Sequence, residues 1–220
     1  MARLLGVSVD AHDPDAQAAF WGDLLGRPTD GPVVRGGDGP GLELRFEPGA
    51  TGKTQPNWIH LHLTSARPGD QERTVERALG LGATHLDVGQ TPDEGHVVLA
   101  DPEGNELCVI EAGNRFLAGT GFLGELACDG TRAVGLFWSE ALGWPLHWDQ
   151  DEETSIQSPL GGTKVSWGGP PVAPKGGRRM RFRVAATESE VERLVALGAR
   201  RQDPGVLADP DGNEFVVRPD

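Results

Sequence analysis

The chain has 220 residues, of which 37% are hydrophobic, and a formal net charge of −13. This composition is that of a globular protein, with room for one large domain or for two of about 110 residues. Because an acidic chain repels phosphate backbones and anionic membranes, we expect neither nucleic acid nor a membrane as a partner. The two cysteines, Cys108 and Cys128, lack CxxC spacing, which argues against a disulfide framework or a structural zinc site.

The first residues do not have the pattern of a leader segment. A short apolar run is broken early by Asp10 and His12, and no segment approaches the length of about 18 apolar residues that a membrane span needs. We therefore expect a soluble, cytoplasmic protein.

In chain order, the first elements are a strand over 4–10 and a helix. The helix is entered at Asp13-Pro14, where a capping carboxylate precedes a proline suited to the first turn, and it ends at Gly26. A short strand over 42–46 and a strictly alternating strand over 59–63 follow, then a helix over about 72–81. Asp-Pro-Glu-Gly-Asn at 101–105 predicts a turn between two last strands.

The second half of the chain repeats this order. Its elements are a strand over 121–127, a helix ending at Gly143, strands over 164–167 and 180–184, a helix over about 188–197, and a turn at 209–213. Three sequence blocks recur: Phe20-Trp21 as Phe137-Trp138, 75–83 as 191–199, and 98–106 as 206–214. We predict a tandem duplication with domains at 1–113 and 118–220, an α+β fold, and a shortened hairpin in the second copy, which has eight residues fewer there.

The pattern of Phe-Trp, then Leu-Gly, then Leu-Gly-Ala and Asp-Pro-x-Gly-Asn-Glu is similar to the glyoxalase/bleomycin-resistance/extradiol-dioxygenase superfamily, the vicinal oxygen chelate fold. The resemblance covers nearly the whole chain, twice. It implies two tandem glyoxalase-like domains, each of paired βαβββ modules that form curved antiparallel sheets with helices on the outer face. It does not specify a reaction, because this fold hosts isomerases, lyases, dioxygenases and non-catalytic drug-binding proteins.

The catalytic members of that superfamily hold a divalent metal with His or Glu side chains on the first, fourth, fifth and eighth strands. These positions align with Gly6, Glu43, His60 and Cys108 in the first copy, and with Leu123, Lys164, Arg181 and Val216 in the second. The second copy therefore offers no ligand. The first offers Glu43 and His60, which need help from His62 or Glu106 on the same strand faces. We expect no cofactor, with a divalent metal at Glu43 and His60 as the alternative.

The same resemblance implies a pocket on the concave sheet of the first copy. We expect its catalytic groups to be Glu43, His60, His62 and Glu106, since a histidine beside a carboxylate is a suitable base near neutral pH. Ligand-binding groups would be Ser8, Asp10, Trp58 and Cys108. In the second copy, Lys164, Arg179, Arg181 and Arg183 suit a carboxylate or phosphate, unless they form a solvated face or pair with acidic residues.

Three functions follow, in order of preference. The first is a bleomycin-resistance-like protein that binds a small organic molecule without a full metal site, or an enzyme that uses acid–base chemistry alone. The second is a metal-dependent lyase, isomerase or dioxygenase with its site in the first domain. The third is an interaction module, which the polar free sheet face disfavours. The expected partner is a small-molecule ligand, whether the protein is a monomer or a homodimer, and the sequence leaves open whether it is an enzyme.

Overall fold

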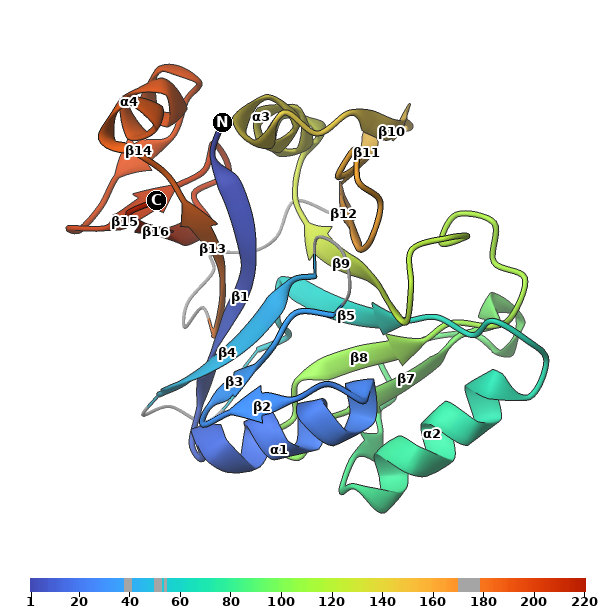
Figure 1. The fold of residues 1–220 in the computed structure, drawn as a ribbon. Coiled ribbons are helices and arrows are strands. Elements are labelled where there is room, and N and C mark those ends of the chain that lie inside the picture. Colours follow the sequence, from blue (N-terminus) through green and yellow to red (C-terminus); the bar gives the residue numbers. More distant parts are fainter. Residues whose placement is uncertain (38–40, 50–52, 54, 170–178) are drawn as a thin grey trace.

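A computed structural model describes residues 1–37, 41–49, 53, 55–169 and 179–220 of the chain. Four βαβββ modules follow one another along it (Figure 1). Module 1 (3–48) contains β1 (Arg3–Ala11), α1 (Pro14–Leu25), β2 (Thr29–Asp30), β3 (Val33–Val34) and β4 (Glu43–Pro48). Module 2 (59–109) contains β5 (Ile59–Leu63), α2 (Asp70–Gly80), β6 (Thr84–His85), the short 3-10 helix η1 (Pro92–Glu94), β7 (Val97–Ala100) and β8 (Glu106–Val109).

The second repeat has the same two modules. Module 3 (123–168) contains β9 (Leu123–Asp129), α3 (Arg132–Leu142), β10 (Leu146–Gln150), β11 (Glu153–Gln157) and β12 (Lys164–Gly168). Module 4 (180–218) contains β13 (Met180–Ala185), α4 (Glu188–Ala196), β14 (Arg200–Arg201), β15 (Val206–Ala208) and β16 (Glu214–Arg218). The connection between β14 and β15 is shorter than that between β6 and β7.

The four modules form two eight-stranded sheets, and each sheet takes one module from each repeat. Sheet A joins modules 1 and 4 in the order β14-β15-β16-β13-β1-β4-β3-β2. Sheet B joins modules 2 and 3 in the order β10-β11-β12-β9-β5-β8-β7-β6. The modules meet through the antiparallel pairs β1–β13 and β5–β9. Each sheet is mixed rather than wholly antiparallel, because the first strand of every module runs parallel to its fourth.

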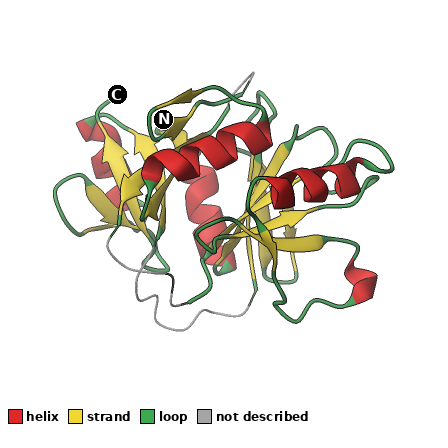
Figure 2. Cartoon of the chain, turned by 90° about the horizontal axis from the view of Figure 1, so that it is seen from below, coloured by secondary structure: helices red, strands yellow, loops and turns green. Residues whose placement is uncertain are grey.

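The helices begin and end where the sequence predicts. At the start of α1 the Asp13 side chain accepts a hydrogen bond from the backbone N–H of Ala16 at 3.0 Å, and Pro14 takes the first helical position. Gly26 then closes α1 with a left-handed φ of 65°, as Gly143 closes α3 with a φ of 66°. Figure 2 shows helices packed against the strands on both sides of the molecule and one helix between the two groups of strands.

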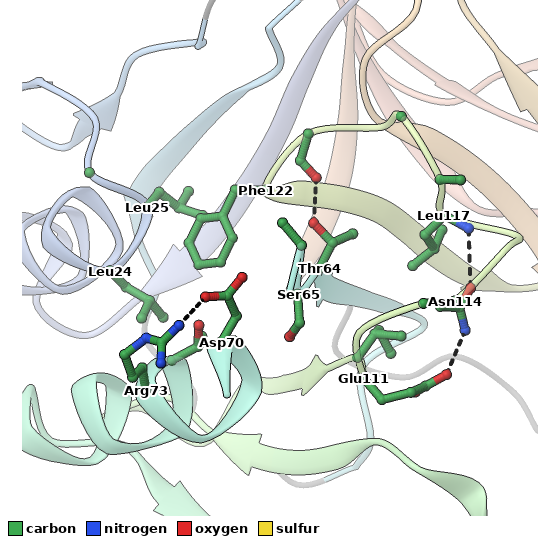
Figure 3. Close-up of a pocket in the computed structure, with 18 of the residues that line it drawn as sticks. Leu24, Leu25, Thr64, Ser65, Asp70, Arg73, Glu111, Asn114, Leu117 and Phe122 are labelled. Carbon is green, nitrogen blue, oxygen red and sulfur yellow. Dashed lines mark hydrogen bonds and ion pairs between the residues drawn. The ribbon is translucent and has the colours of Figure 1, made fainter. Parts of the chain in front are cut away.

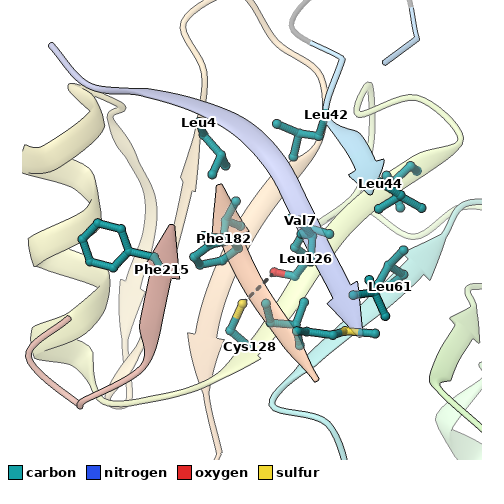
Figure 4. Packing of buried hydrophobic residues seen from close by; sticks show 14 of the residues in the cluster. Leu4, Val7, Leu42, Leu44, Leu61, Leu126, Cys128, Phe182 and Phe215 are labelled. Atoms are coloured by element: carbon teal, nitrogen blue, oxygen red, sulfur yellow. Dashed lines mark hydrogen bonds between the residues drawn. The ribbon is translucent and has the colours of Figure 1, made fainter. Parts of the chain in front are cut away.

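One hydrophobic core holds both sheets together. The alternating strand β5 has the predicted bounds and buries Ile59, Leu61 and Leu63, which leaves His60 and His62 on the opposite face. Figure 4 shows residues of both sheets in this core, among them Phe182 from sheet A and Leu126 from sheet B. Because the apolar face of each strand packs in the core, a site can form only on the opposite face.

The Phe-Trp and Asp-Pro-x-Gly-Asn blocks recur together because they contact each other. Trp21 of α1 donates through Nε1 to Oδ2 of Asp101 at 3.0 Å, and Trp138 of α3 does the same to Asp209 at 3.4 Å. Oδ1 of Asp101 also accepts from the backbone N–H groups of Glu103 and Asn105 at 2.9 Å. Within each repeat this contact ties the helix of one sheet to the turn of the other. Among the described residues, no helix is long and apolar enough to cross a membrane.

Candidate functional site: a concave pocket on sheet B

The strand register of sheet B brings four polar side chains into one row. His62 on β5 lies opposite Cys108 on β8 and opposite Glu125 on β9, and Glu125 lies opposite Lys164 on β12. Side chains opposite each other in a sheet point to the same face. Two of these residues come from the first repeat and two from the second, so neither repeat forms the row alone.

Glu125 is the centre of a buried hydrogen-bonded group. Its Oε2 lies 2.8 Å from Nδ1 of His62, and its Oε1 accepts from the hydroxyl of Ser166 at 2.5 Å. The Glu125 side chain is 6% exposed, whereas that of His62 is 19% exposed. The carboxylate is therefore held from two sides, and the imidazole edge is the part of the group that is nearer to solvent.

The surroundings of His62 favour its protonated form. Burial lowers its pKa, but hydrogen bonds to Cys108 and Glu125 and the negative charge of Glu125 outweigh burial and raise the pKa to about 10. His62 is therefore an imidazolium near neutral pH. Such a group donates hydrogen bonds and is poorly suited to the role of base that the sequence predicted for it.

A pocket of about 530 Å³ opens over this row. Trp148 of β10, 40% exposed, forms one part of its wall, and Phe116 from the connection between the repeats forms another. The carboxylates of Glu125, Asp129 and Glu153 line it together with His60 and His62. The arrangement combines aromatic walls with acidic groups, so it suits an organic molecule with a flat body.

Two further polar contacts engage His60 and Glu106, the other residues of sheet B that the sequence predicted to be catalytic. Nε2 of His60 lies 2.7 Å from the backbone carbonyl of Asn57. On the neighbouring strand β8, Glu106 is bound by the ammonium group of Lys53, and it accepts the backbone N–H of Asn57 at 3.3 Å. Glu106 and His60 are thus engaged in local structure.

Lys164 is held away from the pocket by the connection between the repeats. Its ammonium group donates to the backbone carbonyl of Phe116 and lies 4.5 Å from the centre of the Phe116 ring. Burial lowers the pKa of Lys164, and the charge of Glu125 partly opposes that effect. The lysine therefore anchors Phe116 over the row.

Sheet A has an equivalent row with different chemistry. Gly6 on β1 lies opposite Glu43 on β4 and opposite Arg183 on β13, and Arg183 lies opposite Val216 on β16. The guanidinium group of Arg183 is 3.3 Å from Oε2 of Glu43. A Cβ atom at Gly6 would lie only 2.0 Å from the backbone oxygen of Glu43, so no side chain fits at that position without a backbone shift.

The arginines of β13 are paired with acidic residues, which is the alternative that the sequence left open. Arg181 makes a two-pronged contact with Asp10 at 2.9 and 3.1 Å. Arg179, just before β13, pairs with Glu103 at 2.7 Å and also donates to the backbone carbonyl of Asp10. Among the described residues these contacts occupy the side chains that were expected to clamp an anion.

The structure separates several residues that the sequence placed in one pocket. Glu43, Ser8 and Asp10 lie on sheet A, whereas His60, His62, Glu106 and Cys108 lie on sheet B. Glu43 and His60 therefore do not share a site. Trp58 is 4% exposed and donates to the backbone carbonyl of Met180 at 2.8 Å, so it belongs to the core between the sheets.

Sequence reasoning did not assign Glu125 and Ser166, which come from the second repeat, to a site with His62. It compared the two copies position by position and assumed that each copy formed its own sheet. The two-residue spacing of Glu125 and Ala127 along β9 puts them on the same face of the strand, and both line the pocket. That pattern identifies the face but not the module with which β9 pairs.

The residues present do not fit the divalent metal that the superfamily resemblance implies. In sheet A, a guanidinium group lies beside the only acidic group of the row. In sheet B, Lys164 lies in the row, and Glu106 is bound to Lys53. Within the ranges that the structure describes, no three His, Cys, Asp or Glu side chains gather closely enough to hold a metal ion.

The chain belongs to the glyoxalase-like domain family, whose model matches residues 6–110 and 125–218. The two matched ranges correspond to the two repeats. A search of curated proteins gives no match.

Solved structures with the same architecture include glyoxalase I from Zea mays, with 15% identity and a TM-score of 0.66 over 99% of this chain and 92% of that chain. A putative dioxygenase from Bacillus subtilis subsp. subtilis str. 168 is similar at 12% identity and a TM-score of 0.57, over 98% of this chain and 85% of that chain. At such identities the similarity establishes the fold and not the reaction. The vicinal oxygen chelate fold inferred from the sequence is confirmed.

Proposed function

We propose that this protein binds a small organic molecule in the concave pocket of sheet B. The observation that carries the proposal is the buried His62–Glu125–Ser166 group beneath a pocket of about 530 Å³ with an exposed tryptophan on its wall. Buried polar groups beneath an apolar-walled pocket are what orients a small ligand.

The charges favour a ligand with a positive or hydrogen-bond-donating group on a flat apolar body. Glu125 and Glu153 contribute two carboxylates to the pocket, against the imidazolium of His62. Trp148 provides an aromatic face on which a flat or cationic body can stack. An anionic ligand would meet repulsion from the carboxylates.

Binding fits the geometry better than base catalysis does. A general base needs a pKa near the working pH, whereas the pKa of His62 is raised to about 10. The metal-dependent lyase, isomerase or dioxygenase is the other function that the fold admits, but the donor sets of both sheets oppose it.

Three aromatic compounds of nearly equal shape test the proposal: benzamidine, benzamide and benzoate, which are cationic, neutral and anionic at neutral pH. We expect binding at millimolar concentration, as ligands of this size allow, in the order benzamidine, benzamide, benzoate. Tryptophan fluorescence would report it, with chemical-shift changes as a second readout.

The control variants are Trp148→Ala, which removes the aromatic wall, and Leu160→Ala, which changes an exposed residue that does not line the pocket. Trp148→Ala should abolish benzamidine binding as seen by chemical shifts, and Leu160→Ala should leave it unchanged. Equal binding of the three compounds, or binding that survives Trp148→Ala, would contradict the proposal.

A further inference from the structure

A second cavity lies outside the concave faces of the sheets. It has a volume of about 860 Å³ and lies between the end of α1, the helix α2, the chain that follows β5, and the connection between the repeats (Figure 3). We call it the helix–linker pocket. Phe116 lines the pocket of sheet B and Leu117 lines the helix–linker pocket, so consecutive residues serve two separate cavities.

The walls of this pocket are largely apolar. Leu24 and Leu25 come from α1, Ile110 and Leu117 from the connection, and Phe122 from the chain just before β9. Phe122 is 36% exposed. Figure 3 shows the Phe122 ring beside Leu25, above Asp70 and Arg73. An occupant with an apolar body would cover this ring.

Two polar features show what else the occupant would carry. Ser65 lines the pocket, is 8% exposed, and its hydroxyl has no hydrogen-bond partner among the described residues. A buried hydroxyl without a partner loses free energy that a ligand can restore. Because this oxygen is almost wholly inaccessible, the Ser65 side chain has to rotate before a ligand in the pocket can reach it.

The second feature is a difference between two arginines that lie one turn apart on α2. Arg73 forms an ion pair with Asp70 at 2.5 Å. Arg77 donates to the backbone carbonyl of Asp23, and within the described part of the chain it pairs with no carboxylate. Asp70 therefore neutralises the charge of Arg73. The guanidinium group of Arg77 is available to an anion, on the side of the pocket that α1 and α2 form.

The acidic residues of the pocket do not cancel this charge. Asp70 is matched by Arg73, and it also accepts the backbone N–H of Arg67 at 2.7 Å. Glu111 accepts from the side chain of Asn114 at 3.0 Å. Figure 3 shows Glu111 and Asn114 across the pocket from Leu24 and Arg73. An anionic group at the helices therefore lies away from Glu111.

We propose that the helix–linker pocket binds an amphiphilic organic anion. Its apolar body lies against Leu24, Leu25, Leu117 and Phe122, and its anionic group lies at Arg77. This ligand class is opposite in charge to the one that the pocket of sheet B favours, so the two cavities accept different molecules. The proposal does not depend on the function proposed for sheet B.

Two fluorescent probes of the same shape test it. The first is 1-anilinonaphthalene-8-sulfonate, an apolar anion, and the second is N-phenyl-1-naphthylamine, which lacks the sulfonate. We expect Arg77→Gln to weaken binding of the anionic probe about fivefold and to leave binding of the neutral probe unchanged. Arg67→Gln removes the same charge close by, at an arginine that does not line the pocket, and it should change either affinity by less than about twofold.

Phe122→Ser tests the apolar wall and should weaken both probes. Trp148→Ala, in the pocket of sheet B, should weaken neither. If both arginine variants lose the same affinity for the anionic probe, binding depends only on the net charge of the protein, and the proposal is overturned. So would binding that is lost in Trp148→Ala, or a wild-type affinity that Phe122→Ser does not alter. Circular dichroism of each variant shows that the compared proteins are folded.

Discussion

His62 and Glu125 belong to different sequence repeats, yet they face each other on adjacent antiparallel strands with 2.8 Å between Nδ1 and Oε2. Because the pKa of His62 is raised in the folded state, the pair stabilises the fold fully below about pH 6.5, the pKa of an unfolded histidine. That contribution is lost as the pH rises towards about 10. We expect the free energy of unfolding to fall across this window in the wild type.

Glu125→Gln should flatten this fall, because the amide no longer favours the imidazolium. Urea unfolding at several pH values between about 6 and 10 measures the effect. Glu153→Gln, also in the pocket but on the exposed start of β11, is the matched control and should keep the wild-type slope. An unchanged slope in Glu125→Gln would show that the pair does not control the titration of His62.

Asp101 and Asp209 occupy the same place in the two repeats but are held differently. Burial raises the pKa of both carboxyl groups, and hydrogen bonds oppose that rise. Trp21 donates to Asp101 at 3.0 Å, whereas Trp138 donates to Asp209 at 3.4 Å. We expect Asp101→Asn to lower the free energy of unfolding by about 2–3 kcal/mol, and Asp209→Asn by less. Urea unfolding at neutral pH compares them, and a larger loss for Asp209→Asn would contradict the ranking.

The pair of Glu43 and Arg183 on sheet A should show energetic coupling. Glu43→Ala leaves the buried guanidinium of Arg183 without its carboxylate and should cost about 1–3 kcal/mol of stability. Arg183→Met in that background should recover part of the loss, since it removes the unpaired charge. A double-mutant cycle with chemical unfolding measures the coupling. Strictly additive losses would show that the two groups do not interact.

Gly6 is expected to tolerate no side chain. Its φ is 147°, and a Cβ atom would meet the backbone oxygen of Glu43 at 2.0 Å. Gly6→Ala should therefore separate β1 from β4 and destabilise the protein by about 3 kcal/mol or more. Gly80→Ala, where a Cβ atom meets nothing within 4 Å, should leave the melting temperature nearly unchanged. A Gly6→Ala protein as stable as wild type would be incompatible with this strand contact.

Elemental mass spectrometry should find far less than one equivalent of transition metal in protein purified without a histidine tag. The same result is expected after incubation with iron, nickel, manganese and zinc, because cationic side chains lie among the available donors. About one equivalent of metal that is lost in His62→Ala would instead show a metal centre on sheet B. In that case a metal-dependent enzymatic activity would be the better proposal for the function of this protein than ligand binding alone.

The local features of this protein follow from its sequence. Asp13-Pro14 and Gly26 set the ends of α1, and the alternation of apolar residues sets the bounds and the buried face of β5. Capping and alternation are short-range effects that act within a few residues of the chain. Internal repetition then revealed two copies, because duplicated blocks keep their order, and the motifs within them resembled the family.

Only the tertiary structure decided which modules share a sheet. Module 2 pairs with module 3 and module 1 with module 4, so Glu125 joins His62 while Glu43 is carried to the other sheet. Repeated modules have similar strand edges, so the periodicity of one strand does not distinguish its possible partners. The pairing depends on long-range packing in one core shared by both sheets, where Trp58 and Phe182, far apart in the sequence, meet edge to face. The concave pocket is therefore a property of the assembled chain and of neither repeat alone.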